Sequence, residues 1–529
     1  MEKLGIAAQT GLRTGTQAAA FAPAGKAIGV LTLVAAALRL FLLGHKSFWF
    51  DEAASYRFCR FTPAAFKALL WQHELNMSAY YVLLRGWLHL GTSEFVIRLL
   101  SVLFAVATIP VFYAVGARLL PRRTALLATG LLAVNATHVA YSQEARGYSL
   151  AVFLCTLSCL FFVRLLGYRA EQLTATVPVD EVSRAKISGV TGNCVLYVLF
   201  SAAAVYAHFF AVLAIAAQWL ALVAYPRRIP WCRLLLCGFF MAVLLLPAAW
   251  FVLTRNSGQL DWVPPLSALM VLKVITMLSG HAVAVVIYVP LWIVAVRHAI
   301  CLQRRERQLS PANQIRVSRG SAGGSTTSST LACCDTAWPF WFLLSWAVLP
   351  FLISAAISLS RPVVHPRFLI VSLPAAVLLG AAGIDALGKR RRVALMAAVV
   401  LSFAGVVHYY TLSKEDWRGA SHYVLTNSAP GDAILFMPEY VDGPYDYYQQ
   451  QARKDSTRPA FERAAQFAAA AASRAWLVVY DPQRVDSYRE AEMRKIDAAF
   501  EGRYSVVSRR QFKKIDVVLY EKNSRTTDP

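Results

Sequence analysis

The sequence is poor in charge for a chain of its length. Of its 529 residues only 16% are Asp, Glu, Lys or Arg, whereas 57% are hydrophobic, and the mean hydropathy is +0.47. A soluble domain carries about 25% charged residues, and an intrinsically disordered chain has a far lower apolar content. The shortage of charge therefore argues against a soluble multidomain enzyme and a disordered protein, and it favours a polytopic membrane protein.

Several features of secreted, zinc-binding and nucleotide-binding proteins are also missing. The nine cysteines include no CxxC pair with zinc spacing, and none follows Cys334, so we expect neither a disulfide framework nor structural zinc. We recognise no cleavable signal peptide before the first long apolar run, which begins near Ala27 and is expected to remain as a first span. The sequence also has no recognisable nucleotide-binding loop.

The net charge of +23 is unevenly distributed. Residues 412–529 contain 18 Lys and Arg against 17 Asp and Glu, whereas residues 1–411 contain 35 against 13. The excess lies between apolar runs, as in the positive-inside pattern of membrane proteins. A nucleic-acid-binding protein would gather it on a soluble face, so we expect no nucleic-acid partner.

The apolar runs predict about eleven transmembrane helices, since a span needs about 20 largely apolar residues. These runs lie near 28–45, 95–117, 124–140, 147–166, 193–208, 209–225, 234–253, 280–299, 338–360, 367–387 and 393–411. The run 266–279 is too short to span and is expected at the membrane interface.

The positions of Lys and Arg predict the orientation. They indicate a cytoplasmic N-terminal segment, 1–27, a transmembrane catalytic domain, 28–411, and a flexible cytoplasmic loop rich in Arg, Ser and Gly, 303–337. An odd number of spans then places residues 412–529 outside. We expect a multi-pass protein of the cell inner (plasma) membrane whose active site and C-terminal domain are extracytoplasmic.

The C-terminal segment, 412–529, is patterned as a small α/β domain. Strand-like runs occur at 433–437, 476–480, 504–507 and 515–520, and helical patterns at 416–426, 461–472 and 486–499. The segment is long enough to bury a core of its own.

The first predicted outer loop, 46–94, begins with two adjacent carboxylates, Asp51 and Glu52, which directly follow Phe48, Trp49 and Phe50. A partly desolvated carboxylate near the bilayer can act as a general base. The same residues would equally suit a solvated helix N-terminus flanked by interfacial aromatic anchors.

Two further outer motifs carry acids. His73 and Glu74 could together ligate a divalent metal ion, or they could form a polar turn at the interface. Glu144 and Arg146 lie between two apolar spans, where charge is costly in lipid, so they are expected to face an aqueous cavity or each other.

Other polar groups on the predicted outer side form a set rich in cations. Arg matches the geometry of phosphate, so the set suits a phosphate-bearing ligand, although each residue alone could be a snorkelling anchor. Its members are His208, Arg255, Asp261, Lys273, Arg361, His365 and Arg367.

Taken together, these motifs resemble the bacterial members of the protein O-mannosyltransferase and aminoarabinose-transferase superfamily, which is glycosyltransferase family 39-like and has the GT-C fold. The resemblance covers residues 28 to about 425 and rests on FWFDEA, HELNMSAYYVLLRGWLHLGTSEFVIRLLSVLFA, YSQEARGYSL, HPRFLIVSLP and EDWRGASHYV. It implies an inverting transfer of a sugar from a polyprenyl- or dolichyl-phosphate carrier to an acceptor hydroxyl, at a site facing the periplasm or lumen.

The resemblance also implies roles for individual residues. Asp51 matches the catalytic acid of the first outer loop and Glu52 its neighbour. Glu74 matches the acid near the metal site of some relatives. Two departures occur: Met77-Ser78 replaces a Pro-containing turn, and Arg367-Phe368 replaces Arg-Tyr, which puts in doubt a tyrosine hydroxyl at that place.

We therefore predict a GT-C membrane glycosyltransferase, hexosyl- or pentosyl-transferring and mannosyltransferase-like, with Asp51 as general base. Its partners would be membrane lipid, a polyprenyl-phosphate-linked sugar donor and an acceptor protein, lipid or glycan. The sequence identifies no cofactor other than the divalent metal ion that His73 and Glu74 could ligate. The catalytic set is Asp51, Glu52 and Glu144, and the donor-phosphate-binding set is Arg146, His208, Lys273, His365 and Arg367.

Two alternatives share the predicted spans. A transporter or flippase of lipid-linked sugars would often show internal repeats and a site near the midplane, but we detect no repeat and the acids gather on one side. A membrane-anchored scaffold would work through its C-terminal α/β domain, which shows no catalytic constellation. Both comparisons favour the transferase.

Overall fold

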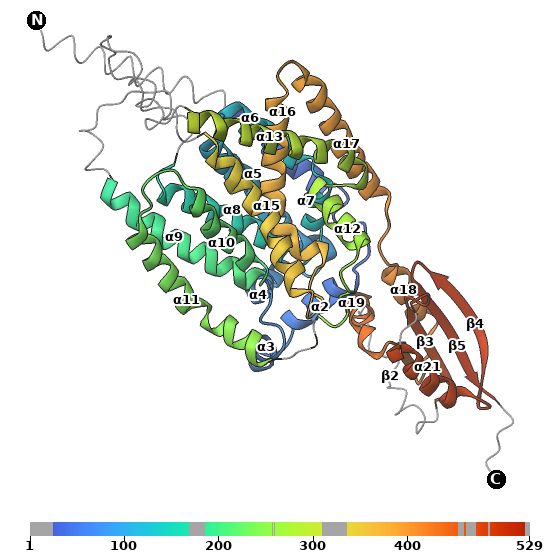
Figure 1. The fold of residues 1–529 in the computed structure, drawn as a ribbon. Helices are drawn as coiled ribbons and strands as arrows, with labels where there is room; N and C mark the ends of the chain where they lie inside the picture. Colours follow the sequence, from blue (N-terminus) through green and yellow to red (C-terminus); the bar gives the residue numbers. More distant parts are fainter. Residues whose placement is uncertain are drawn as a thin grey trace, which may run out of the picture. The chain divides into compact units, whose positions relative to one another are not determined.

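The computed structural model describes residues 25–168, 186–255, 258, 260–308, 336–452, 460–461, 472–484 and 487–523 (Figure 1). Most of the predicted N-terminal segment and cytoplasmic loop, and most of the helix predicted at 461–472, lie outside the described residues. The chain divides into two compact units. The first contains Met1–Phe41, Ala68–Tyr80 and Leu99–Tyr409, and the second contains Leu42–Lys67, Tyr81–Arg98 and Tyr410–Pro529.

Seven helices of the described residues are long and apolar enough to cross a membrane. Two of them, α8 and α16, are largely surrounded by protein, so they form the centre of the helical part. The seven are α5 (Glu94–Leu119), α8 (Tyr148–Leu165), α11 (Trp231–Thr254), α13 (Val285–Gln308), α15 (Trp338–Ile357), α16 (Leu373–Ala386) with the preceding 3₁₀ helix η6 (Pro366–Ser372), and α17 (Arg391–Thr411).

An eighth span is broken. The helices α6 (Arg122–Ala133) and α7 (Ala136–Ser142) are bent by 54° at the residues between them. The cause is local, because the Asn135 side chain accepts a hydrogen bond from the His138 backbone N–H at 3.0 Å and starts a new helix.

The remaining apolar helices are shorter or only partly described. They are a helix at 25–40, α9 (Lys186–Ala207), α10 (Ala211–Leu220) and α12 (Ala268–Ser279). Each of the eleven predicted apolar runs coincides with a helix or a broken helix, and the run judged too short to span is α12. The prediction of a polytopic α-helical membrane protein is confirmed.

The second unit contains a five-stranded mixed sheet in the order β2-β1-β3-β5-β4. Strand β1 (Ala433–Met437) runs parallel to β2 (Ala460–Phe461) and to β3 (Arg474–Tyr480), whereas β5 (Ile515–Lys522) is antiparallel to β3 and to β4 (Tyr504–Phe512). Apolar side chains fill both faces of β1 and most of β3, so these central strands are buried, as in α/β sheets covered on both faces.

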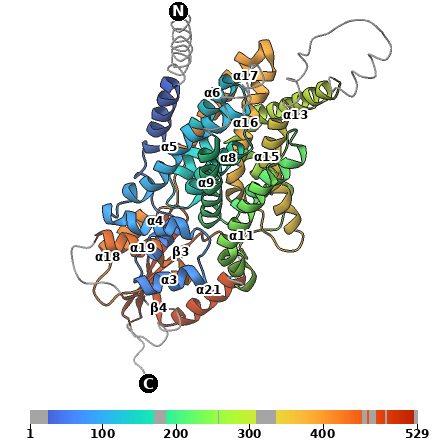
Figure 2. The ribbon, with the colours of Figure 1, turned by 90° about the vertical axis from the view of Figure 1, so that its left-hand side faces the viewer.

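Helices complete the second unit. Ile496 and Phe500 of α21 (Ser487–Phe500) are buried in one core with Leu435 and Leu477 of the sheet. Figures 1 and 2 show α21 and α18 (Trp417–Asn427) beside the strands. The predicted C-terminal α/β fold is confirmed, although the short strand β2 and helix α19 (Asp442–Ala452) were not predicted.

The helix that carries Asp51 belongs to the second unit. Helix α2 (Phe50–Cys59) packs against α19. The Tyr447 ring lies 4.6 Å from the Phe48 ring and 5.1 Å from the Tyr56 ring, measured between centroids. Arg57 donates to Asp442 at 2.8 Å. The start of the predicted outer loop therefore folds with the C-terminal segment.

Candidate catalytic site

Asp51 and Glu52 both lie in the first turn of α2, where the helix dipole favours negative charge. Their surroundings differ, because Asp51 is half-buried whereas Glu52 has no exposed surface. A group that accepts a proton from a substrate must reach that substrate. Of the two carboxylates, only Asp51 meets this condition.

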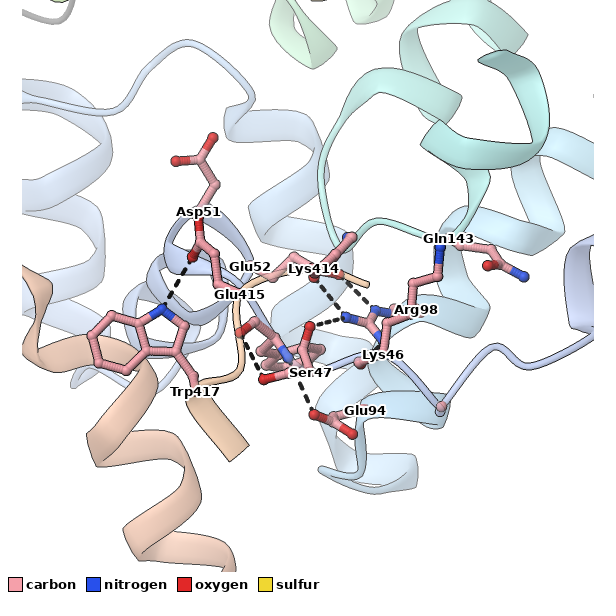
Figure 3. A network of polar contacts seen from close by, with 12 residues as sticks. Lys46, Ser47, Asp51, Glu52, Glu94, Arg98, Gln143, Lys414, Glu415 and Trp417 are labelled. Carbon is pink, nitrogen blue, oxygen red and sulfur yellow. Dashed lines mark hydrogen bonds and ion pairs between the residues drawn. The ribbon is translucent and has the colours of Figure 1, made fainter. Parts of the chain in front are cut away.

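Glu52 is held by an ion-pair network inside the unit (Figure 3). Arg98 donates to both carboxylate oxygens at 2.7 Å, through Nε to Oε1 and through Nη2 to Oε2. Lys414 donates to Oε2 at 3.1 Å. A bidentate pair of this kind is strong and geometrically specific, so Glu52 is fixed in one orientation.

Arg98 also fixes the turn before α2. Its guanidinium donates to the backbone carbonyls of Leu43, Lys46 and Ser47 at 3.1, 2.7 and 3.1 Å, and it lies 4.9 Å from the centre of the Phe48 ring. One buried arginine therefore holds both the turn 43–47 and the first turn of α2. Sequence reasoning missed Arg98, because it lies inside a run predicted as a span.

A second ion pair holds the same turn from another side. Glu94 accepts hydrogen bonds from Arg418 and from the Tyr448 hydroxyl. The backbone N–H of Phe48 donates to the Tyr448 oxygen at 2.8 Å. Burial, together with the Glu94 charge, raises the Tyr448 pKa above its ordinary value, so this hydroxyl keeps its proton. Arg418 also donates to the Gly44 carbonyl at 3.0 Å.

A third carboxylate, Glu415, was not among the predicted site residues. It is buried and accepts from the Trp417 indole N–H at 3.0 Å (Figure 3). It also accepts from the Tyr480 hydroxyl at 2.6 Å. Burial raises the Glu415 pKa above its ordinary value, and the two hydrogen bonds oppose this shift. The negative charge of Asp51 contributes to raising the pKa of Tyr480. Tyr480 therefore interacts with Glu415, to which it donates, and with the proposed base.

The first unit contains the second outer motif, in the turn between α7 and α8. Glu144 and Arg146 are half-buried there. Gly147 follows, and a Cβ at this position would lie 2.6 Å from the Ala207 carbonyl oxygen and 3.3 Å from Met77. The close approach of these backbones therefore requires glycine, and it fixes the turn that carries Arg146.

Arg367 lies in a group of aromatic rings at the start of η6. Its guanidinium carbon is 4.5 Å from the centre of the Trp262 ring and 5.7 Å from that of Phe368, as in a cation–π contact. The His365 ring lies 5.0 Å from Trp262 and 5.4 Å from Phe368. Arg367 and His365 are thus neighbours around shared rings.

His208 joins the same group. It is 1% exposed, and its ring centre lies 5.5 Å from Phe368 and 5.7 Å from Tyr148. The charges of Arg146 and Arg367 both act on its ring. Its Nδ1 accepts from the Phe210 N–H at 3.3 Å, and in the described part of the chain its buried Nε2 has no hydrogen-bond partner. We call Arg146, His208, His365 and Arg367 the arginine–histidine cluster.

Other predicted cations lie at the surface of the first unit. Lys273 is exposed on α12. Arg361 pairs with Asp261 at 3.4 Å, and these side chains are 50% and 73% exposed, so the pair contributes little. Arg255 lies over the Trp250 ring at 5.3 Å. None of these contacts builds an enclosed site.

The residues proposed for a metal, His73 and Glu74, belong to no group of three possible ligands in the described part of the chain. His73 is exposed, and the backbone N–H groups of His73 and Glu74 both donate to the Leu69 carbonyl, at 2.9 and 3.0 Å. Among the residues that the structure describes, no three His, Cys, Asp or Glu side chains come together in a group that could hold a metal ion.

Comparison with solved structures identifies the fold. The chain is similar to ArnT from Cupriavidus metallidurans in the apo state, with a TM-score of 0.58 and 12% sequence identity over 93% of this chain and 97% of that one. ArnT bound to undecaprenyl phosphate gives a TM-score of 0.54 at 12% identity, over 95% and 99% of the two chains.

A weaker similarity extends to the oligosaccharyltransferase of Archaeoglobus fulgidus tethered with an acceptor peptide, with a TM-score of 0.49 and 11% identity over 95% of this chain and 74% of that one. At this score the similarity carries no weight. No protein-family model matches the sequence, and no curated protein matches it either. The predicted GT-C fold is confirmed by the similarity to ArnT.

Proposed function

We propose that this protein is an integral membrane glycosyltransferase that moves a sugar from a polyprenyl-phosphate carrier to an acceptor hydroxyl. The observation that supports this most strongly is the similarity to ArnT over nearly the whole of both chains, including ArnT bound to undecaprenyl phosphate. A donor carried on a lipid phosphate needs no nucleotide-sugar site, and the sequence has no recognisable nucleotide-binding loop. We propose that the transferred sugar is a hexose or a pentose, as in a mannosyltransferase-like enzyme.

Asp51 is the proposed general base. It accepts the proton of the acceptor hydroxyl while the acceptor oxygen attacks C1 of the sugar. The bond between C1 and the phosphate oxygen breaks with its electron pair, and the carrier leaves as a phosphate anion. Attack opposite the leaving group inverts the configuration at C1. Glu52 does not take part directly, since its carboxylate is engaged by Arg98 and Lys414.

The arginine–histidine cluster is the proposed site for the donor phosphate. Two guanidinium groups can hold phosphate oxygens with several charge-assisted hydrogen bonds, and they stabilise the charge that develops as the carrier leaves. The buried His208 Nε2 offers a further polar contact. Glu144, in the same turn as Arg146, orients that arginine, and Lys273 assists from the surface of α12.

The proposal also includes the location and orientation of the protein in the membrane. We place the reaction on the outer face of the cell inner membrane, with residues 28–411 as the membrane domain and 412–529 as an extracytoplasmic domain. The excess of Lys and Arg between the apolar runs of residues 1–411 supports this orientation. No step of the proposed mechanism uses a metal ion.

The test is a transfer assay with the purified full-length protein. A panel of radiolabelled polyprenyl-phosphate sugars is incubated with the protein and a membrane extract, and the labelled product is identified. The proposal expects the label to leave the carrier and appear on an acceptor. Movement of intact labelled carrier across vesicles, with no product that lacks the carrier, would instead favour a flippase.

A further inference from the structure

We infer that a polar cavity in the second unit binds the uncharged, hydroxyl-rich saccharide end of the acceptor. This inference rests on the proposed function, and it adds the chemical class of the acceptor. The cavity has a volume of about 320 Å³, which lies at the lower end of the range for small-molecule sites. Its walls come from 45–47, 410–416, Arg418 and Lys513.

The first argument is the balance of charge. Four basic side chains line the cavity, namely Lys46, Lys414, Arg418 and Lys513, together with the acids Glu415 and Asp416. Lys414 is paired with Glu52 and Arg418 with Glu94. Glu52 is also paired with Arg98, so the lining and its ion pairs hold five basic groups against four acidic ones. The charges nearly cancel, which leaves little positive charge with which to select a phosphate and suits a neutral ligand.

The second argument is the mixture of hydrogen-bonding groups. Lysine and arginine only donate and ionised carboxylates only accept, whereas hydroxyls such as those of Ser47 and Ser413 do both. The walls thus offer donors and acceptors close together; Lys513 Nζ, for example, donates to the Ser413 carbonyl and hydroxyl at 2.6 and 2.8 Å. Sugar hydroxyls also donate and accept, so a saccharide can satisfy such a lining, and an aliphatic ligand cannot.

The third argument is the position of the cavity beside the proposed base. Lys414, which forms part of the wall, donates to Glu52 at 3.1 Å, and Glu52 is the residue next to Asp51. Glu415 in the same wall accepts from Tyr480, on which the Asp51 charge acts. A saccharide held here is bound by residues in direct contact with the turn that carries the base.

The experiment measures binding to the full-length protein in detergent by saturation-transfer NMR. The probes are methyl α-D-mannopyranoside and, in a separate arm, inorganic phosphate. We expect transfer to the glycoside, and a loss of affinity of about tenfold in Lys513→Met, as for a lost hydrogen bond to a charged group. Lys522→Met, at the end of β5 and outside the cavity, should leave the affinity unchanged.

Three results would overturn the inference: absence of glycoside binding, binding that Lys513→Met does not weaken, or phosphate that displaces the glycoside and is itself weakened by Lys513→Met. The transfer assay separates this failure from failure of the proposed function. If wild-type protein transfers sugar but binds no glycoside here, the cavity is not the acceptor site and the function stands. If the glycoside binds but no donor is ever consumed, the proposed function fails.

Discussion

Asp51 and Glu52, two neighbouring carboxylates in the first turn of α2, have different surroundings. Asp51 is half-buried, whereas Glu52 is enclosed by Arg98 and Lys414. The sequence predicts that this pair matters, because two acids follow a predicted span and three aromatic residues. It could not predict which acid is engaged, since the partners of Glu52 lie 46 and 362 residues further along the chain.

Glu52→Gln is expected to act mainly on stability. The substitution leaves the buried Arg98 guanidinium without its charged partner, and breaking a buried ion pair in this way costs about 3–5 kcal/mol. Thermal unfolding of the purified variant in detergent, followed by tryptophan fluorescence, should show a clearly lowered Tm. Glu501→Gln, at an exposed position after α21, is the control. Equal Tm values for the two variants would contradict the role given to Glu52.

Glu415 should make stability depend on pH. Because burial raises its pKa in the folded protein, the folded state favours the protonated acid. This contribution is complete below the ordinary pKa of a glutamate, 4.5, and is lost as the pH rises through the raised value. The Tm of wild type minus that of Glu415→Gln should therefore be largest below pH 4.5 and should fall toward neutral pH. A difference that grows with pH would show that the carboxylate is stabilised as the anion.

At the level of elements, the apolar runs predict the membrane helices, and the strand-like and helical patterns of residues 412–529 predict most of the second unit. The eleven apolar runs, the four longer strands and the helices α18 and α21 all appear where the sequence places them. The break between α6 and α7 was not predicted, since it depends on one capping side chain, Asn135. The sequence does place Arg146 and Arg367 in one phosphate-binding set, but not the packing of α8, α9 and η6 on which their approach depends.

Gly147 provides a test of that packing. In Gly147→Ala the added methyl group would lie 2.6 Å from the Ala207 carbonyl, so the turn that carries Arg146 must shift. We expect the affinity for a polyprenyl phosphate to fall about tenfold, comparable to losing one charge-assisted hydrogen bond. Equilibrium binding of the radiolabelled lipid measures this.

The matched control for that measurement is Gly192→Ala in α9, where a Cβ meets nothing within 4 Å and alanine favours the helix. It should bind the lipid as wild type does. Unchanged binding in Gly147→Ala as well would remove Arg146 from the proposed phosphate site.

At the scale of the whole molecule, the two compact units are interleaved in the sequence. Residues 42–67 and 81–98 belong with 410–529, so the start of the predicted outer loop is built into the C-terminal unit. Hydropathy could not reveal this association, because its contacts join segments that are far apart in the sequence, as Phe48 with Tyr447 and Glu94 with Arg418. The composition predicts two domains that follow one another along the chain. In the structure, each compact unit instead combines segments from separate parts of the sequence.

Truncation after residue 425 tests this division. It removes Tyr448 and the sheet, so the turn before α2 loses one of its two supports. It leaves the arginine–histidine cluster intact. We expect binding of polyprenyl phosphate to survive and transfer to the acceptor to be lost, as measured by lipid binding and by product formation. Complete loss of lipid binding in a truncated protein that is otherwise well folded would contradict the assignment of the phosphate to the first unit.

The most direct test of the proposed chemistry is the single-turnover rate of Asp51→Asn with saturating donor. Asparagine is nearly isosteric but cannot accept the proton, and loss of a general base costs about 10²–10⁴ in rate. We expect a decrease of that size, with donor binding and Tm close to those of wild type. A wild-type rate in a normally folded Asp51→Asn protein would show that Asp51 is not the base, and Glu144 would then be the next carboxylate to test.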